Sequence, residues 1–243
     1  MTTAYSVTVL LQSLKDFDRV KELDIDAVSI PCYQAEDICN TGSTQFEGLK
    51  AAQVSHPDIE ELACQCRIIG IKLIGTPGSL KEAQFLARIG VDQIAIDAQH
   101  IPRAMEFINP IAQLKKPMVL RLGNVTWEQI GKAFYAAHAG HHVTLLHQNV
   151  SRDGEVLWTD HNLGLITELT RVYPKCIIGY SDATGTTCVE MAYGLGGRVY
   201  ECTPDYADAV VTKVRHCQEL MGKTVRYVSE SERAWREMMN ARE

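Results

Sequence analysis

The chain has 243 residues, of which 46% are hydrophobic, so we expect one large core and one domain. Its formal net charge of −6 argues against a surface dedicated to nucleic acid or to an anionic membrane. No apolar run reaches the ~20 residues of a membrane span, and the first residues lack the basic region of a signal peptide. We therefore expect a cytoplasmic protein whose eight cysteines are reduced thiols.

Apolar runs and amphipathic stretches alternate along the chain. The apolar runs, typical of strands buried on both faces, are residues 7–12, 27–32, 72–75, 93–98, 117–122, 143–147, 176–180 and 199–202. The stretches with apolar residues at helical spacing are 14–23, 55–69, 79–89, 102–114, 126–139, 162–172 and 187–195. Ser55 and Thr126 stand where helix caps are expected, and Gly70 and Gly90 follow the ends of their helices.

This alternation predicts a parallel sheet covered by helices. Eight strands favour a closed (β/α)8 TIM barrel as a single domain over residues 1–243, with helices within residues 206–243 packing on it. An open, doubly wound sheet is the alternative, because periodicity does not show whether a sheet closes. Pro110 falls inside the helix expected at residues 102–114 and should interrupt or redirect it.

The polar residues between positions 176 and 205 gather at the carboxyl ends of the last two predicted strands. In a parallel barrel the loops after the strands converge on one face, where active sites lie. The side chains that we expect at the strand ends are Arg121, His147, Gln148, Asp182, Glu201, Cys202 and Asp205.

Arg121 is the most suggestive of these side chains, because a guanidinium on an apolar strand is costly unless it is paired. It could clamp a phosphate or carboxylate through two hydrogen bonds, or form a buried pair with Asp97 or Glu201. His147 could be a metal ligand or general acid, but it could equally be a hydrogen-bonded core histidine.

The turn after the seventh predicted strand also has two interpretations. Asp182 with Ser181 and Thr184 could bind a hydroxylated ligand. They could instead only shape the turn, since Asp and Ser readily bond to nearby backbone.

Residue types that bind divalent metals occur at the same strand ends, namely Glu201, Cys202, Asp205 and His147. Residue types do not establish geometry, so this pattern leaves a metal site open. Cys202 and Cys32 are expected to be buried structural thiols rather than nucleophiles, because no histidine base is identifiable beside either.

Several segments of the chain occur in an order and spacing that match a group of barrel enzymes. They are DAVSIPCYQAEDI, GIKLIGTPGSLKEAQFLARIGVDQIAI, KKPMVLRLGNVTWEQI, VTLLH and IIGYSDATG, within a match over residues 26–242. These segments resemble the sialic acid synthase family, whose members condense phosphoenolpyruvate with an aldose to make nonulosonic acids. The resemblance implies a barrel enzyme of that family, without the C-terminal antifreeze-like domain that follows the barrel in its members.

The chain departs from this family where the family binds its ligands. The two histidines that hold a divalent metal in the family correspond to Ala183 and Thr203. The residues that contact phosphate and substrate on strands two, four and five correspond to Ser29, Pro31, Ala95, Ala98 and Arg121-Leu122-Gly123. The resemblance thus implies a divalent metal such as manganese, which Ala183 and Thr203 disfavour, and we assign no metal ligand.

We hypothesise a divergent sialic acid synthase-like protein that condenses phosphoenolpyruvate with a sugar aldehyde in nonulosonic acid or surface-carbohydrate biosynthesis. A catalytically degenerate barrel that binds or scaffolds a partner is one alternative, and a different lyase or isomerase activity at the barrel mouth is another. Under the enzyme hypothesis, Glu201, Asp182 and His147 are catalytic. The substrate-binding residues are then Arg121, Ser181, Thr184, Thr76 and Gln148.

The expected ligand is small and anionic, of the phosphorylated sugar type. Neither nucleic acid nor membrane is expected as a partner. A homodimer and association with a partner enzyme are both left open.

Overall fold

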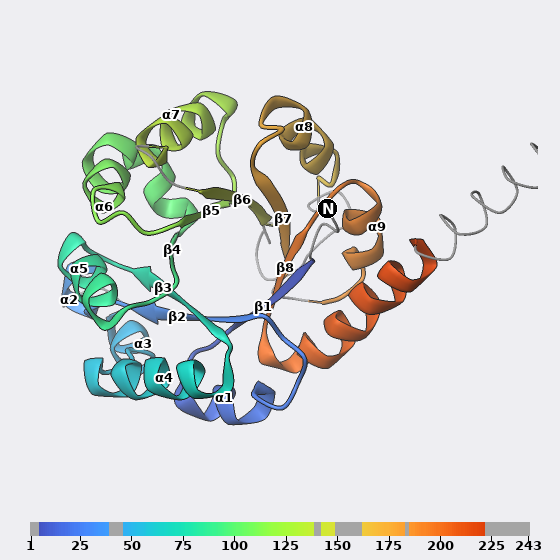
Figure 1. Ribbon diagram of the computed structural model, residues 1–243. Coiled ribbons are helices and arrows are strands. Elements are labelled where there is room, and N and C mark those ends of the chain that lie inside the picture. Colours follow the sequence, from blue (N-terminus) through green and yellow to red (C-terminus); the bar gives the residue numbers. More distant parts are fainter. Residues whose placement is uncertain (1–4, 39–45, 139–141, 149–161, 183–184, 222–243) are drawn as a thin grey trace, which may run out of the picture.

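The computed structural model describes residues 5–38, 46–138, 142–148, 162–182 and 185–221. Its centre is a closed barrel of eight parallel strands in sequence order, with β1 also paired to β8 (Figure 1). The strands are β1 (Ser6–Leu10), β2 (Ala27–Cys32), β3 (Lys72–Pro77), β4 (Gln93–Ile96), β5 (Met118–Leu122), β6 (Val143–Gln148), β7 (Ile177–Asp182) and β8 (Val199–Cys202). The predicted (β/α)8 barrel is confirmed, and its closure decides against the open sheet.

Helices form a ring around the strands (Figure 1). They are α1 (Leu14–Val20), α2 (Ala35–Ile38), α3 (Phe46–Ala51), α4 (His56–Ile69), α5 (Leu80–Ile89), α6 (Asn109–Ala112), α7 (Trp127–Ala137), α8 (Gly164–Val172) and α9 (Val189–Gly194). Ser55 caps α4 by accepting a bond from the Asp58 amide, and Gly70 ends that helix in the left-handed conformation at φ 80°. The cap and stop signals in the sequence therefore act as expected at this helix.

The helix expected at residues 102–114 is interrupted ahead of Pro110, as the sequence predicts. The segment divides into the 3-10 helix η1 (Ala98–Arg103), the π-helix η2 (Ala104–Ile108) and the single turn α6. Pro110 has no N–H to donate to the carbonyl of Glu106, and its ring crowds that carbonyl. The turn before it therefore widens, as π-helical turns do where the regular hydrogen-bond ladder is interrupted.

Residues 207–221 are helical as predicted and pack on the barrel through Ala207, Val210, Val214 and Cys217. The further helix expected through residue 239 lies outside the described residues. Among the described residues, no helix is long and apolar enough to cross a membrane.

Two apolar clusters build the core, one on each side of the strands. The larger cluster fills the space between strands and helices. The smaller one lies at positions that alternate with it along the strands, so it fills the barrel interior; it consists of Ala27, Ile74, Ala95, Val119 and Leu146, with Val199 against it. Successive side chains of a strand point to opposite faces. A shift of a strand's register by one residue would therefore exchange its interior residues with those that face the helices.

Two residues further along the chain, the barrel interior changes from apolar to polar at seven of the eight strands, β2 to β8. These positions are Ser29, Thr76, Asp97, Arg121, Gln148, Ser181 and Glu201. We call this set the polar layer. It lies at the carboxyl ends of the strands, the end of a parallel barrel at which chemistry is placed.

Gly179 of β7 makes room in the apolar interior. A Cβ at this position would lie 2.6 Å from the Val199 carbonyl oxygen and 2.6 Å from Leu146 Cδ1. We therefore expect Gly179→Ala to lower the free energy of unfolding by about 1–3 kcal/mol, the usual cost of overpacking.

Gly131 is the matched control, since it lies within α7 and a Cβ there would have no atom within 4 Å. Gly131→Ala should raise the free energy of unfolding by about 0.5–1 kcal/mol, because alanine favours a helix over glycine. Urea denaturation measures both changes. A Gly179→Ala protein as stable as the parent would show that the interior is not packed as described.

Candidate functional site

Arg121 of β5 is the centre of a hydrogen-bond network in the polar layer. Its Nε lies 3.0 and 3.1 Å from the two oxygens of Glu201, and its Nη2 lies 2.7 Å from Glu201 Oε2. Nη1 donates to Thr76 Oγ1 and to Asp97 Oδ1, both at 2.9 Å, and Nη2 also donates to Ser29 Oγ at 2.8 Å. A guanidinium has five N–H groups, so every one of them in Arg121 has an acceptor.

The network joins one guanidinium to two carboxylates, and the two carboxylates differ in their exposure to solvent. The side chains of Arg121 and Glu201 are 5% and 2% exposed, whereas that of Asp97 is 44% exposed. Burial by itself lowers the pKa of Arg121, but the charges of Glu201 and Asp97 outweigh burial and raise that pKa above its usual value. Arg121 thus forms a buried pair with Glu201 and a second, half-exposed pair with Asp97, so one negative charge remains in excess at the rim.

Glu201 is held from two sides. Ser181 Oγ donates to its Oε1 at 2.9 Å, and Arg121 occupies both of its oxygens. The Ser29 and Thr76 hydroxyls lie 3.3 Å apart and complete the network. Buried polar groups with all partners in place rigidify a site, so this layer is a fixed platform.

A pocket of about 210 Å³ opens above the platform. It is lined by Leu10, Leu11, Ser29, Pro31, Thr76, Asp97, Arg121 and Gln148. Of the predicted site residues, the structure therefore places Arg121, Thr76 and Gln148 in the pocket wall, with Glu201 and Ser181 in contact beneath. Thr184 lies outside the described residues.

His147 and Asp182 lie at the alternate positions of their strands. His147 is paired in register with Tyr180, and Asp182 with Cys202, two residues that belong to the core between strands and helices. The His147 and Tyr180 ring centroids are 6.0 Å apart, and the Tyr180 hydroxyl donates to Asp182 Oδ2 at 3.4 Å. The structure thus groups His147 and Asp182 on the outer side of the strands, apart from the pocket lining.

Burial also decides the state of Tyr180. It raises the pKa of the Tyr180 phenol, with the Asp182 charge adding to the effect. The phenol therefore stays protonated and serves as a donor to Asp182 throughout the neutral range.

The cysteines of the described residues are free thiols. Burial, with the charges of Glu201 and Asp182 adding to it, raises the pKa of Cys202 to about 12. A thiol with so high a pKa is protonated near neutral pH and is a poor nucleophile. Cys202 is thus structural, as the sequence indicated.

Manganese does not fit the residues at the barrel mouth. Thr203 stands where the resemblance implies a metal-binding histidine, and Ala183, at the other such position, lies outside the described residues. Asp205 forms an ion pair with Arg19. Among the side chains that the structure describes, neither Glu201, Cys202 nor His147 belongs to a group with metal-binding geometry.

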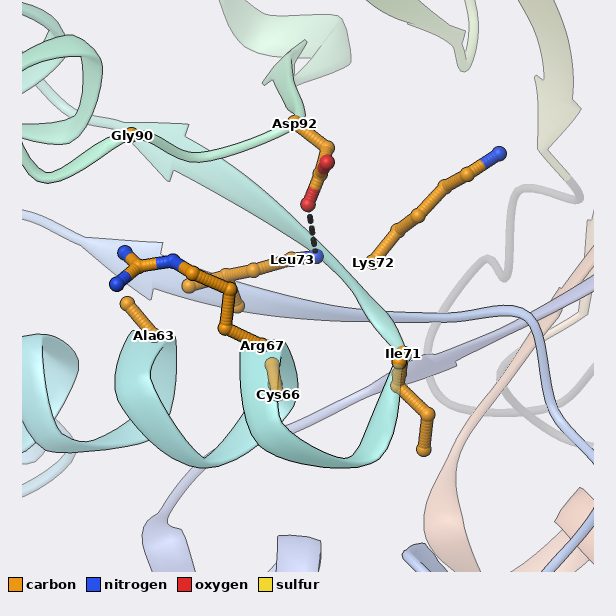
Figure 2. Close-up of a pocket in the computed structure, with 9 residues that line it drawn as sticks. Ala63, Cys66, Arg67, Ile71, Lys72, Leu73, Gly90 and Asp92 are labelled. Atoms are coloured by element: carbon orange, nitrogen blue, oxygen red, sulfur yellow. Dashed lines mark hydrogen bonds between the residues drawn. The ribbon is translucent and has the colours of Figure 1, made fainter.

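Two larger pockets lie at the opposite, amino-terminal ends of the strands. One of about 310 Å³ lies beside the start of β3, where Figure 2 shows Asp92 directed at the Leu73 amide, which donates to it at 2.8 Å. Another of about 800 Å³ lies between the ends of α7 and α8 and includes Phe134, Tyr173 and Ile177. In barrels of this kind the amino-terminal end carries stability rather than chemistry, so neither of these pockets is the candidate site. A further pocket of about 460 Å³ lies at the carboxyl ends, beside the segment after β1, but no residue of the polar layer lines it. The pocket of about 210 Å³ above the polar layer is therefore the candidate site.

Solved structures of similar shape share the closed (β/α)8 barrel fold of this chain. The chain is similar to an N-acetylneuraminic acid synthetase from Leptospira borgpetersenii, with a TM-score of 0.82 at 18% identity over 90% of this chain and 85% of that one. It is also similar to a truncated 3-deoxy-D-arabino-heptulosonate 7-phosphate synthase from Thermotoga maritima, with a TM-score of 0.71 at 11% identity over 91% of this chain and 89% of that one. Identities this low establish the fold alone.

The NeuB family model matches residues 16–223, and the chain belongs to this family. It is 25% identical over 202 residues to the N,N'-diacetyllegionaminic acid synthase of Legionella pneumophila, covering 74% of this chain and 56% of that protein. It is 27% identical over 191 residues to an uncharacterized protein of Methanocaldococcus jannaschii, covering 74% of this chain and 53% of that protein. The chain thus spans about half the length of the curated relatives it matches.

Asp97 and Ser29 are pocket residues that sequence reasoning did not assign to the site. Each lies two positions beyond an alanine of the barrel interior, Ala95 and Ala27. The period of two was therefore the signal that could have found them, but only once the inward face of each strand was known.

Removing Arg121 alone should destabilise the protein strongly, because Glu201 would remain buried without its cation. We expect Arg121→Met to lower the free energy of unfolding by about 3–5 kcal/mol. The double variant Arg121→Met, Glu201→Leu should recover much of this loss, since a buried pair replaced by apolar residues is often tolerated. A double-mutant cycle in urea measures the coupling, and additive effects of the two substitutions would contradict the pairing.

Proposed function

We propose that the protein acts in the biosynthesis of nonulosonic acids or surface carbohydrates, as a sialic acid synthase-like barrel that binds a sugar-type ligand at its mouth. The observation that carries this proposal is the polar layer beneath a pocket at the carboxyl ends of a NeuB-family barrel. The names of the relatives from Legionella and Leptospira support the carbohydrate class of the ligand.

The pocket groups suit a ligand rich in hydroxyl groups. Asp97 is half exposed and can accept from a ligand hydroxyl, while Gln148 offers both a donor and an acceptor. The Leu10 and Pro31 side chains supply apolar wall against which the carbon face of a sugar can pack.

Condensation of phosphoenolpyruvate with a sugar aldehyde is the reaction that we propose for this site. The donor carries a phosphate and a carboxylate, and such groups need cationic or amide donors. Arg121 is the cation of the pocket lining, and its N–H groups are already bonded. Asp97 is the exposed one of its two carboxylate partners, so it must leave Nη1 before an anionic ligand can take its place.

In this scheme Glu201 is a positioning residue. Its two-point contact fixes the plane of the Arg121 guanidinium, and Ser181 fixes Glu201 in turn. When Asp97 moves away, the Nη1–H group that bonded to it is free to donate to a ligand in the pocket.

A second candidate is a barrel that binds a partner or ligand without catalysis. The full occupation of Arg121 favours it, as do Ala183 and Thr203 at the positions of the family's metal-binding histidines. The two candidates differ in turnover, so a single assay separates them.

Calorimetry and thermal shift with phosphoenolpyruvate and amino sugars, each with and without manganese, test the proposal. A native-state ligand must raise the unfolding midpoint by mass action. We expect stabilisation by the amino sugar, and release of inorganic phosphate when both ligands are present. Binding without phosphate release would favour the non-catalytic barrel. If no ligand of either class stabilises the protein at millimolar concentration, the carbohydrate proposal is wrong.

The variant Asp97→Ala tests how Arg121 meets an anion. It frees one N–H of Arg121 and removes a negative charge from the rim, so affinity for phosphoenolpyruvate should rise about tenfold, or roughly 1.4 kcal/mol. Affinity for a neutral amino sugar should fall, because Asp97 is lost as an acceptor.

Asp205→Ala is the matched control, since it makes the same charge change at an exposed aspartate paired with Arg19 outside the pocket lining. It should leave both affinities unchanged. An Asp97→Ala protein that binds phosphoenolpyruvate no better than the parent would remove Arg121 from the anion site.

A further inference from the structure

Three side chains with metal-binding groups meet on the outer side of the barrel, away from the pocket. Cys32 is the last residue of β2, His56 is the first of α4, and Glu82 lies in the first turn of α5. Glu82 Oε2 lies 2.6 Å from His56 Nε2 and 3.2 Å from Cys32 Sγ. All three ligand atoms lie within 4.8 Å of one another, and within the described ranges this is the group of three such residues that does so.

The bonds of Glu82 are distributed unevenly over its carboxylate. Glu82 is fully buried, and both neighbours bond to the same oxygen, Oε2. Its other oxygen, Oε1, is buried and has no hydrogen-bond partner among the residues described. An unpartnered buried oxygen is costly, and each such case in a native protein calls for an explanation such as an ion.

The ligand set indicates the kind of ion. Thiolate, imidazole and carboxylate together are zinc ligands, and three protein ligands leave the fourth position of a tetrahedron to water. Ligand atoms at zinc distances lie roughly 3.3–3.6 Å apart in a tetrahedron, so the His56–Glu82 separation need widen by only about 0.7 Å. The His56 side chain is 34% exposed, which gives an ion a path from solvent.

The surroundings hold the three ligands in place. The His56 ring stacks on Phe85 with centroids 3.9 Å apart, which fixes the plane of the imidazole. Glu82 lies in the first turn of α5, and the start of that helix fixes its position. Cys32 is 1% exposed, and without a metal it is a buried thiol that donates to Glu82.

We propose that Cys32, His56 and Glu82 bind one divalent cation of the zinc type. Binding replaces two hydrogen bonds by metal–ligand bonds, and the Cys32 thiol gives its proton to solvent. The ion would join β2 to α4 and α5, next to the strands that carry Ser29 and Thr76 of the polar layer. The site is independent of the proposed carbohydrate function, because Cys32 points away from the barrel interior that Ser29 faces.

The test uses the whole chain, freed of metal by dialysis against a chelator and titrated with zinc in competition with a chromophoric chelator. We expect one equivalent to bind and the unfolding midpoint to rise with zinc concentration. Cobalt substituted for zinc should give the near-ultraviolet charge-transfer band of a cobalt–thiolate bond, which reports Cys32 directly.

Two substitutions and two matched controls locate the ion. Loss of a metal ligand should weaken zinc binding by more than the roughly 10–100-fold seen for second-shell changes. His56→Gln should do this, whereas His100→Gln, whose ring stacks on Phe107 at 4.0 Å in the same way, should not. Cys32→Ser should abolish the cobalt–thiolate band. Cys66→Ser should keep it, although Cys66 is likewise only 1% exposed.

Circular dichroism of the metal-free variants checks that each one folds. If Cys32→Ser does not fold, His56→Gln decides, because its side chain is partly exposed. Failure of the parent protein to bind zinc at micromolar concentration would overturn the proposal. So would binding that His56→Gln and Cys32→Ser leave intact, and the three residues would then form only a buried hydrogen-bond network.

Discussion

The buried guanidinium of Arg121 is the constraint on which the polar layer depends. A closed barrel sends every second side chain into a space without bulk water, where each polar group needs a partner. Arg121 brings five donors into that space, and the acceptors are supplied by β2, β3 and β8 and by the residue after β4, each two positions beyond the apolar interior. The layer is therefore one cooperative unit rather than a set of separate site residues.

This unit has a consequence for recognition. In the sialic acid synthase family the resemblance places cationic and hydroxyl groups on strands two, four and five, where this chain has Ser29, Ala95 and Arg121. Positive charge in this pocket lining is thus concentrated in one guanidinium, and it is balanced by Glu201 below and Asp97 at the rim. In the binding mode that we propose, Asp97 rather than Glu201 moves aside for an anion, because moving the exposed Asp97 away from Arg121 leaves no buried charge unpaired.

The outer faces of the same strands carry a different chemistry. Cys32 differs from Pro31 by one position, yet it meets His56 and Glu82 behind the barrel while Pro31 lines the pocket. His147 likewise differs from Gln148 by one position and packs near Tyr180. A single residue of register therefore decides whether a strand-end group belongs to the mouth or to the layer under the helices.

The sequence by itself determined the architecture of this protein. The architecture follows from local signals, namely eight apolar runs, helix caps such as Ser55 and helix ends such as Gly70. Such signals can be recognised from neighbouring residues alone, without any information on distant contacts. Pro110 predicted an interruption of its helix, because the effect of proline on a helix is also local. Only the structure showed that a π-helical turn precedes it. The candidate residues Arg121 and Glu201 were also visible, because charged groups on apolar strands are conspicuous.

Only the tertiary structure decided which of these residues act together. Arg121 and Glu201 are 80 residues apart, and Cys32 and Glu82 are 50 apart, so no spacing in the sequence pairs them. Closure of the barrel and the face chosen by each strand bring them together, and they separate His147 and Asp182 from the pocket lining. The fold was determined by periodic, short-range preferences, whereas the site was determined by contacts that exist only after the chain has closed on itself.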